Sequence, residues 1–175
     1  MTIFICHNSG RLCMFEQLEN AIKRGLRGKY IHIDPMKAIE GLTADTACRA
    51  PELGTHSCWS ILHHIVYWQE LMLKALRGEA VDWPKNNEKS WLSDTISKNA
   101  DEWSKLVQKF EQGLIEADTQ AARIDSMDDL PAWPKVPPFA AIMSIAQHNT
   151  YHIGEIVATR QALGYWPPPA YKETF

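Results

Sequence analysis

The chain has 175 residues, 45% of them hydrophobic, and its 18 Lys and Arg residues nearly balance 21 Asp and Glu residues, for a net charge of −3. A chain of this length suits one domain, which can bury roughly 70% of its unfolded surface in one core. The charge balance and the lack of a basic run argue against a surface that follows a phosphate backbone, so we expect no nucleic-acid partner.

Nothing in the sequence indicates a membrane segment or a secretion signal. No stretch approaches 18 consecutive apolar residues, and residues 1–7 are too few and lack the basic start of a signal peptide. The four cysteines form no CxxC pair, which is typical of free thiols in a reducing compartment. We therefore expect a cytoplasmic protein without a membrane partner.

The first residues carry no hydrophobic period and are expected to form an N-terminal arm over residues 1–10, or an extension of the first helix. A single domain over residues 11–175 then follows. Apolar residues at helical intervals predict a helix from residue 12 to residue 27, with a glycine, Gly28, just beyond it as a stop. A short helical turn is predicted at Pro35, since proline is favoured at the first helical position.

Three further long helices are predicted in the rest of the chain. The second ends near Leu76, the third ends near Asp118, and a proline-rich loop leads into the last one, over residues 138–163. The residues available as N-caps are Thr55 or Ser57 for the second helix and Ser93 or Asp94 for the third.

Four long helices and no convincing strand predict an all-α fold, a four-helix bundle with long loops and a proline-rich C-terminal tail. Metal sites in such bundles are commonly built from side chains of facing helices. The ferritin-type di-iron site requires Glu-x-x-His motifs, whereas His152 and Glu155 stand in the reverse order. A di-iron carboxylate site is therefore not expected.

The last helix contains two histidines, His148 and His152, whose four-residue spacing places them one above the other on one face. Their ring nitrogens can converge on a single metal ion. The alternative is a pair of histidines at the edge of the core, hydrogen-bonded to neighbours. Asn149 stands where zinc proteases have their general-base Glu, so peptide hydrolysis by that mechanism is not expected.

A third ligand is predicted on the second long helix, where two adjacent histidines separate on the helical wheel. His64 lies on the same flank as Trp68, whereas His63 points with Glu70 toward solvent. His64 is therefore the predicted third ligand. Three neutral imidazoles leave coordination positions for water or substrate, which is typical of catalytic rather than structural metal sites.

Three motifs occur in order along the chain: residues 28–35, residues 56–64, and residues 148–156 with Arg160 and Leu163-Gly164 after them. With these motifs the chain resembles the DinB-like superfamily, also known by its YfiT branch, of bacterial metal-binding four-helix bundles. The resemblance spans about residues 11–168.

The resemblance implies that His64, His148 and His152 bind a divalent ion, nickel or zinc in the first place and iron or manganese as further options. It also implies a homodimer, and thiol-dependent transferase or isomerase chemistry with a small-molecule thiol as substrate. Glu155 departs from the pattern, because many of the proteins that the chain resembles carry Gln there, and this changes the charge near the metal.

Two functional classes stay open on the sequence. The first is a metal-dependent enzyme acting on a thiol or thiol adduct, as an S-transferase, isomerase or hydrolase. The second is a non-catalytic metal-binding or stress-related bundle with a structural ion. The sequence assigns no catalytic residue beyond the metal ligands, and the candidates for substrate binding are Tyr151, Glu155 and Arg160.

Overall fold

The computed structural model describes residues 6–52, 56–92, 99–168 and 171, and within these ranges every regular element is a helix. The predicted all-α fold is confirmed. None of the described helices combines the length and the apolar character needed to cross a bilayer. The elements are α1 (Cys6–Arg27), α2 (Pro35–Ile39), α3 (Ala44–Ala47), α4 (Cys58–Leu76), the 3-10 helix η1 (Glu88–Ser90), α5 (Ala100–Ala121) and α6 (Pro138–Ala162).

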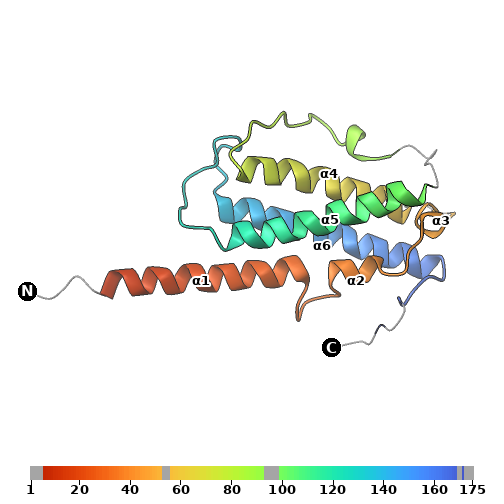
Figure 1. The fold of residues 1–175 in the computed structure, drawn as a ribbon, viewed down its shortest axis with the longest axis horizontal. Helices are drawn as coiled ribbons and strands as arrows, with labels where there is room; N and C mark the ends of the chain where they lie inside the picture. Colours follow the sequence, from red (N-terminus) through yellow and green to blue (C-terminus); the bar gives the residue numbers. More distant parts are fainter. Residues whose placement is uncertain (1–5, 53–55, 93–98, 169–170, 172–175) are drawn as a thin grey trace, which may run out of the picture.

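The long helices lie side by side, with α4 along one side of the bundle, α1 along the opposite side, and α5 and α6 between them (Figure 1). Both α1 and α4 pack against α5 and α6. The short helix α2 follows α1 along the same side and packs against α6. Helix α6 is thus contacted by α1, α2, α4 and α5, which makes it the central element.

Side-chain caps begin the helices that carry or support the site. Ser57 caps α4 by accepting a hydrogen bond from the backbone N–H of Ser60 at 3.2 Å, while the other predicted cap, Thr55, lies outside the described residues. Helix α5 begins after Asn99, whose side chain accepts from the N–H of Asp101 at 2.8 Å. These caps satisfy N–H groups that have no partner inside the helix.

The ends of the predicted elements differ from the structure in several places. Residues 6–10 are the first residues of α1, whereas residues 1–5 lie outside the described part. Helix α3 has no counterpart in the prediction. The caps predicted for α5, and most of the predicted proline-rich tail, fall on undescribed residues: Ser93, Asp94, 169–170 and 172–175.

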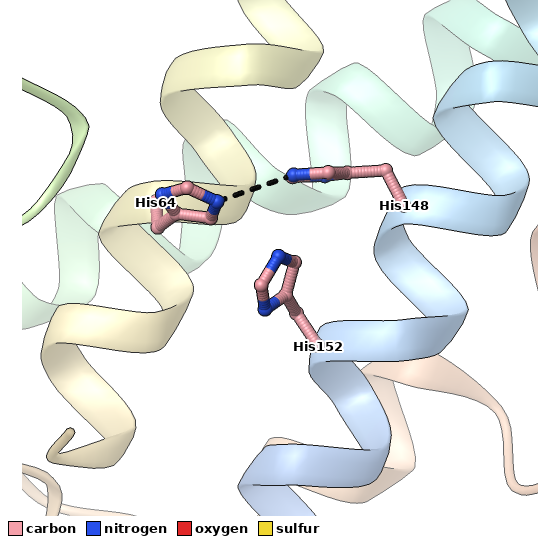
Figure 2. Close-up of side chains that lie close together, drawn as sticks. All are labelled: His64, His148 and His152. Carbon is pink, nitrogen blue, oxygen red and sulfur yellow. Dashed lines mark hydrogen bonds between the residues drawn. The ribbon is translucent and has the colours of Figure 1, made fainter. Parts of the chain in front are cut away.

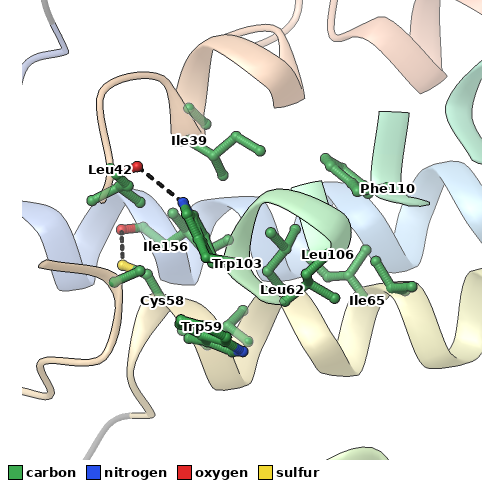
Figure 3. Close-up of a cluster of buried hydrophobic side chains, with 14 of the residues drawn as sticks. Ile39, Leu42, Cys58, Trp59, Leu62, Ile65, Trp103, Leu106, Phe110 and Ile156 are labelled. Carbon is green, nitrogen blue, oxygen red and sulfur yellow. Dashed lines mark hydrogen bonds between the residues drawn. The ribbon is translucent and has the colours of Figure 1, made fainter. Parts of the chain in front are cut away.

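Two clusters of buried apolar side chains form most of the core. One, which we call the α2 cluster, joins α2 and α3 to the first half of α4, to α5 and to the end of α6 (Figure 3). The other, the α1 cluster, joins α1 to the ends of α4 and α5 and to the start of α6. Burying a large apolar side chain contributes about 1.5–3 kcal/mol. The largest buried side chains include Leu62, Ile65, Phe110 and Ile156 in the α2 cluster and Ile22, Leu26, Ile142 and Ile145 in the α1 cluster.

Candidate metal centre

Three histidines from α4 and α6 point toward one another at the seam between these helices (Figure 2). They are His64, His148 and His152, the three that the sequence predicts as ligands. The Nε2 atoms of His64 and His148 are 3.2 Å apart, and one ring nitrogen from each of the three lies within 4.8 Å of the others. His64 and His152 are buried and His148 is half-buried.

The side chain of the adjacent residue His63 points away from the three histidines, as predicted, but it does not point into open solvent. Its Nδ1 atom lies 2.9 Å from the backbone carbonyl oxygen of Ser90, and its side chain is half-buried. The segment after α4 folds back over this face of the helix. Local periodicity places His63 away from the α4–α6 seam, but it carries no information about a loop that returns 27 residues later.

The hydroxyl of Ser90 fixes the proton position on His64. Ser90 Oγ lies 2.6 Å from the carbonyl oxygen of Asn87, which can only accept, so the hydroxyl donates there. The same Oγ lies 2.8 Å from Nδ1 of His64 and is left to accept a hydrogen bond from it. His64 therefore carries its proton on Nδ1, and its Nε2 presents a lone pair to the seam.

Glu155 fixes the proton position on His152, as Ser90 does on His64. Its Oε2 atom lies 2.6 Å from Nδ1 of His152, one helical turn earlier on α6. An ionised carboxylate can only accept, so the proton of His152 is on Nδ1 and its Nε2 is free to bind an ion. A carboxylate behind a histidine is a recurrent support for metal ligands, because it fixes the ring orientation and raises the basicity of the imidazole.

The spacing of His64 and His148 fits a shared divalent ion. Two nitrogens bound to zinc at about 2.0–2.1 Å and at a tetrahedral angle lie roughly 3.3 Å apart. The His64–His148 separation of 3.2 Å matches that geometry. Two nitrogen lone pairs at this distance repel unless a proton or a cation lies between them. Three imidazole ligands also leave at least one coordination position for water or substrate.

The electrostatics of the seam keep two of the imidazoles neutral. Burial, followed by the neighbouring His152 and His148, lowers the pKa of His64 from 6.5 to about 3. Burial, followed by His152, lowers the pKa of His148 to about 4. A protonated imidazole cannot bind a metal, so these lowered pKa values keep lone pairs available at neutral pH.

Aromatic rings surround the histidines on both sides. Trp91 stacks on the His64 ring with centroids 3.9 Å apart, and His56 stacks on the other face of Trp91 at 4.0 Å. Tyr151 meets the His152 ring edge-on at 4.9 Å and is exposed. The sequence did not predict a role for Ser90 or Trp91, because the segment around the short helix η1 has no hydrophobic period.

The three candidates for substrate binding lie in two different places. Tyr151 and Glu155 flank His152 at the centre. Arg160 is buried, and its guanidinium donates hydrogen bonds to the carbonyl oxygens of Ala38 and Tyr165. Arg160 thereby joins α2 to the end of α6. The substrate-binding roles of all three stay predictions.

The sequence was compared with known families, curated proteins and solved structures. A family model described as the DinB superfamily matches residues 36–156, more than half of the chain. Neither the curated proteins nor the solved structures gave a match. The matched range contains all three histidines of the candidate centre.

Proposed function

Because this chain belongs to the DinB superfamily, we propose that it is a metalloprotein in which His64, His148 and His152 bind a divalent ion, nickel or zinc, that serves a reaction on a small-molecule thiol or thiol adduct. The observation that supports metal binding is the convergence of three imidazole nitrogens within 4.8 Å. Hydrogen bonds to Ser90 and Glu155 leave Nε2 of two of these rings free for the ion.

The chemistry of the donor set supports the thiol part of the proposal. A divalent ion held by neutral imidazoles lowers the pKa of a thiol that coordinates it and so supplies a thiolate at neutral pH. The protein itself orients the ligands: Glu155 keeps the proton of His152 on Nδ1, and Ser90 does the same for His64. Tyr151, exposed beside His152, offers a hydroxyl at the edge where a substrate would approach.

The second candidate function is a structural ion in a non-catalytic bundle. It is favoured by the position of the three histidines, which would cross-link α4 to α6, and by the burial of His64, which is 3% exposed. A structural ion has a closed coordination shell, whereas a catalytic one has an exchangeable water. Binding of a thiol to the metal-loaded protein distinguishes the two.

The first test is metal analysis of the protein purified without an affinity tag, together with four alanine variants. His64→Ala, His148→Ala and His152→Ala should each lose most of the bound metal, since one of three protein ligands is removed. His63→Ala is the matched control and should keep the metal. Metal should also raise the melting temperature of the wild type but not of the three ligand variants.

Two results would contradict the metal centre. If His63→Ala lost the metal and His64→Ala kept it, the assignment of the ligand on α4 would be wrong. If none of the four variants changed metal content, the α4–α6 seam would be ordinary core.

The second test screens thiols against electrophiles with the zinc- or nickel-loaded protein. Turnover that disappears in His148→Ala and is retained in His63→Ala would support the enzyme. Full metal occupancy without turnover, and with no change in the metal spectrum of a cobalt-substituted protein on adding thiol, would favour the structural ion.

The resemblance also motivates a proposal about assembly, namely that the chain forms a homodimer. Light scattering at micromolar concentration should then give twice the monomer mass of 19.9 kDa. A mass equal to that of the monomer would contradict the dimer and leave the metal proposal intact.

A further inference from the structure

A buried chain of hydrogen bonds crosses the bundle beside the three histidines. The side-chain amide nitrogen of Gln69 on α4 donates to the carbonyl oxygen of Phe110 on α5 at 3.2 Å. The side-chain amide nitrogen of Asn149 on α6 donates to Oε1 of Gln69 at 2.8 Å. Gln69 and Asn149 are only 2% and 1% exposed, so water does not compete for these bonds.

The direction of these hydrogen bonds is fixed by the carbonyl oxygen of Phe110. A backbone carbonyl can only accept, so the amide nitrogen of Gln69 faces Phe110 and its oxygen faces Asn149. Asn149 must then present its nitrogen to Gln69, which leaves Asn149 Oδ1 pointing elsewhere. That oxygen is buried and has no hydrogen-bond partner among the described residues. A buried acceptor in this condition destabilises the fold, because it has lost its hydrogen bonds to water and gained none in return.

The neighbouring residue, His148, also has a buried ring nitrogen, Nδ1, without a hydrogen-bond partner in the described part of the chain. Because Ser90 holds the proton of His64 on Nδ1, the 3.2 Å contact between the two Nε2 atoms requires His148 to donate from its own Nε2. Without an ion, His148 therefore carries its proton on Nε2, and its Nδ1 is a second unpaired acceptor.

We propose that Asn149, held by Gln69, is a positioning residue for His148. When Nε2 of His148 binds a metal ion, the imidazole proton is on Nδ1, and Asn149 Oδ1 accepts a hydrogen bond from that N–H group. This inference rests on the proposed metal function. The imidazole stays neutral throughout, with one proton before and after, so only the tautomer changes. The two unpaired acceptors become one hydrogen bond.

A further observation concerns the placement of Gln69. Gly113 on α5 leaves the room that Gln69 needs, because a Cβ at that position would overlap the Gln69 amide nitrogen. Each of the three ligands then has its own support: Ser90 for His64, Asn149 for His148 and Glu155 for His152.

The tautomer is measured directly on the full wild-type chain by long-range proton–nitrogen NMR of the histidine rings, without and with zinc. We expect His148 to change from a proton on Nε2 to a proton on Nδ1 on adding zinc, while His64 and His152 carry theirs on Nδ1 throughout. A His148 that already carries its proton on Nδ1 without zinc, or that binds zinc through Nδ1, would overturn the inference.

The variant that removes the acceptor without a large change in volume is Asn149→Leu. Zinc affinity, measured by competition with a chromophoric chelator, should fall about 10- to 100-fold, the usual effect of removing a partner behind a metal ligand. Gln147→Ala, which changes the exposed residue on the other side of His148, is the control and should bind zinc like the wild type.

The double variant Gln69→Leu with Asn149→Leu separates positioning from a merely structural role. It removes the unpaired Asn149 Oδ1 together with the Gln69 amide, whose oxygen Asn149→Leu alone would leave without a partner. The melting temperature without metal should therefore stay the same or rise while zinc affinity still falls. Wild-type zinc affinity in a folded Asn149→Leu protein would overturn this inference alone. A wild type that binds no zinc would overturn the metal function and this inference with it. If the variants fail to fold, the tautomer measurement on the wild type decides.

Discussion

The two halves of α6 bury very different side chains. In the first half, up to Ala146, the buried residues are aliphatic and belong to the α1 cluster and its surroundings; they are Ala141, Ile142, Ile145 and Ala146. In the second half, buried polar residues alternate with buried isoleucines; the polar ones are Asn149, His152, Thr159 and Arg160. One continuous helix therefore buries only aliphatic side chains in its first half, whereas its second half carries the candidate site together with part of the α2 cluster.

This difference shows that the second half of α6 stabilises the fold less than the first half. The first half of α6 gains free energy from apolar burial. In the second half, three side-chain atoms are buried without a hydrogen-bond partner among the described residues, namely His148 Nδ1, Asn149 Oδ1 and Thr159 Oγ1. Unsatisfied buried polar atoms are rare in native proteins and tend to mark functional sites. The contrast leads to four predictions.

The largest expected effect is on stability and falls in the aliphatic half. Ile145→Ala removes a fully buried side chain between α6 and its neighbours, and should lower the free energy of unfolding by about 2–5 kcal/mol. Urea denaturation measures this loss. Zinc affinity of the folded variant should stay at the wild-type value; a large drop would show that the two halves are not independent.

The second prediction concerns acid. The pKa values of His64 and His148 in the fold, about 3 and about 4, lie below the 6.5 of the unfolded chain. The unfolded state thus binds more protons below pH 6.5, so stability is complete above that pH and falls as pH is lowered toward 4. Between pH 7 and pH 5.5 the metal-free protein should lose about 2 kcal/mol.

Thermal unfolding across this pH range is the measurement for the acid effect. The variant with both His64→Leu and His148→Leu is the control and should show a weaker pH dependence. An equally steep dependence in that variant would assign the acid sensitivity to other groups.

The third prediction tests the support of His64 from the loop. Ser90→Ala removes the acceptor that keeps the His64 proton on Nδ1, and should weaken zinc binding about 10- to 100-fold. Chelator competition measures the affinity, and Ser104→Ala, at an exposed serine of α5, is the matched control. Equal affinities of the two variants would show that Ser90 does not orient the ligand.

The smallest effects distinguish two glycines in helices. Gly113→Ala should displace Gln69 and break its bonds to Phe110 and Asn149, for a net loss of about 1 kcal/mol after the gain in helix propensity. Gly154→Ala meets nothing within 4 Å and should raise stability by up to about 1 kcal/mol. Melting temperatures measure both, and a stabilised Gly113→Ala would contradict the close contact with Gln69.

The long helices and the faces on which the three histidines lie were predictable, because they depend on spacing along one helix. The pair His148 and His152 shares a face through its four-residue separation, and the separation of His64 from His63 follows from the same rotation per residue. The end of α4 at Leu76 and the start of α6 at Pro138 also agree with the structure. Each of these features is local, so it can be read without knowing what packs against it.

The supports of His64 and His148 were not predictable in the same way, whereas Glu155 is one turn from His152 on the same helix. Ser90 reaches His64 because the loop after α4 folds back over the helix, and loop paths leave no periodic signal. Gln69 bonds to Phe110 on a third helix, which depends on how α4 and α5 are rotated and shifted against each other. The sequence contains Gln69 as one more polar residue among apolar ones.

The amino-acid sequence by itself determined an all-helical chain, the face that His148 and His152 share, and the choice of His64 over His63. These follow from the geometry of a single helix, in which about 100° per residue fixes neighbours three and four positions apart. Only the tertiary structure decided which ring nitrogen of His64 faces the seam and what holds Asn149 beside His148, because these depend on Ser90 in the segment after α4 and on Gln69 in α4. Glu155, the partner of His152, is on the same helix as that histidine. Hydrogen bonds act over about 3 Å, and such distances between elements are set by packing rather than by local spacing.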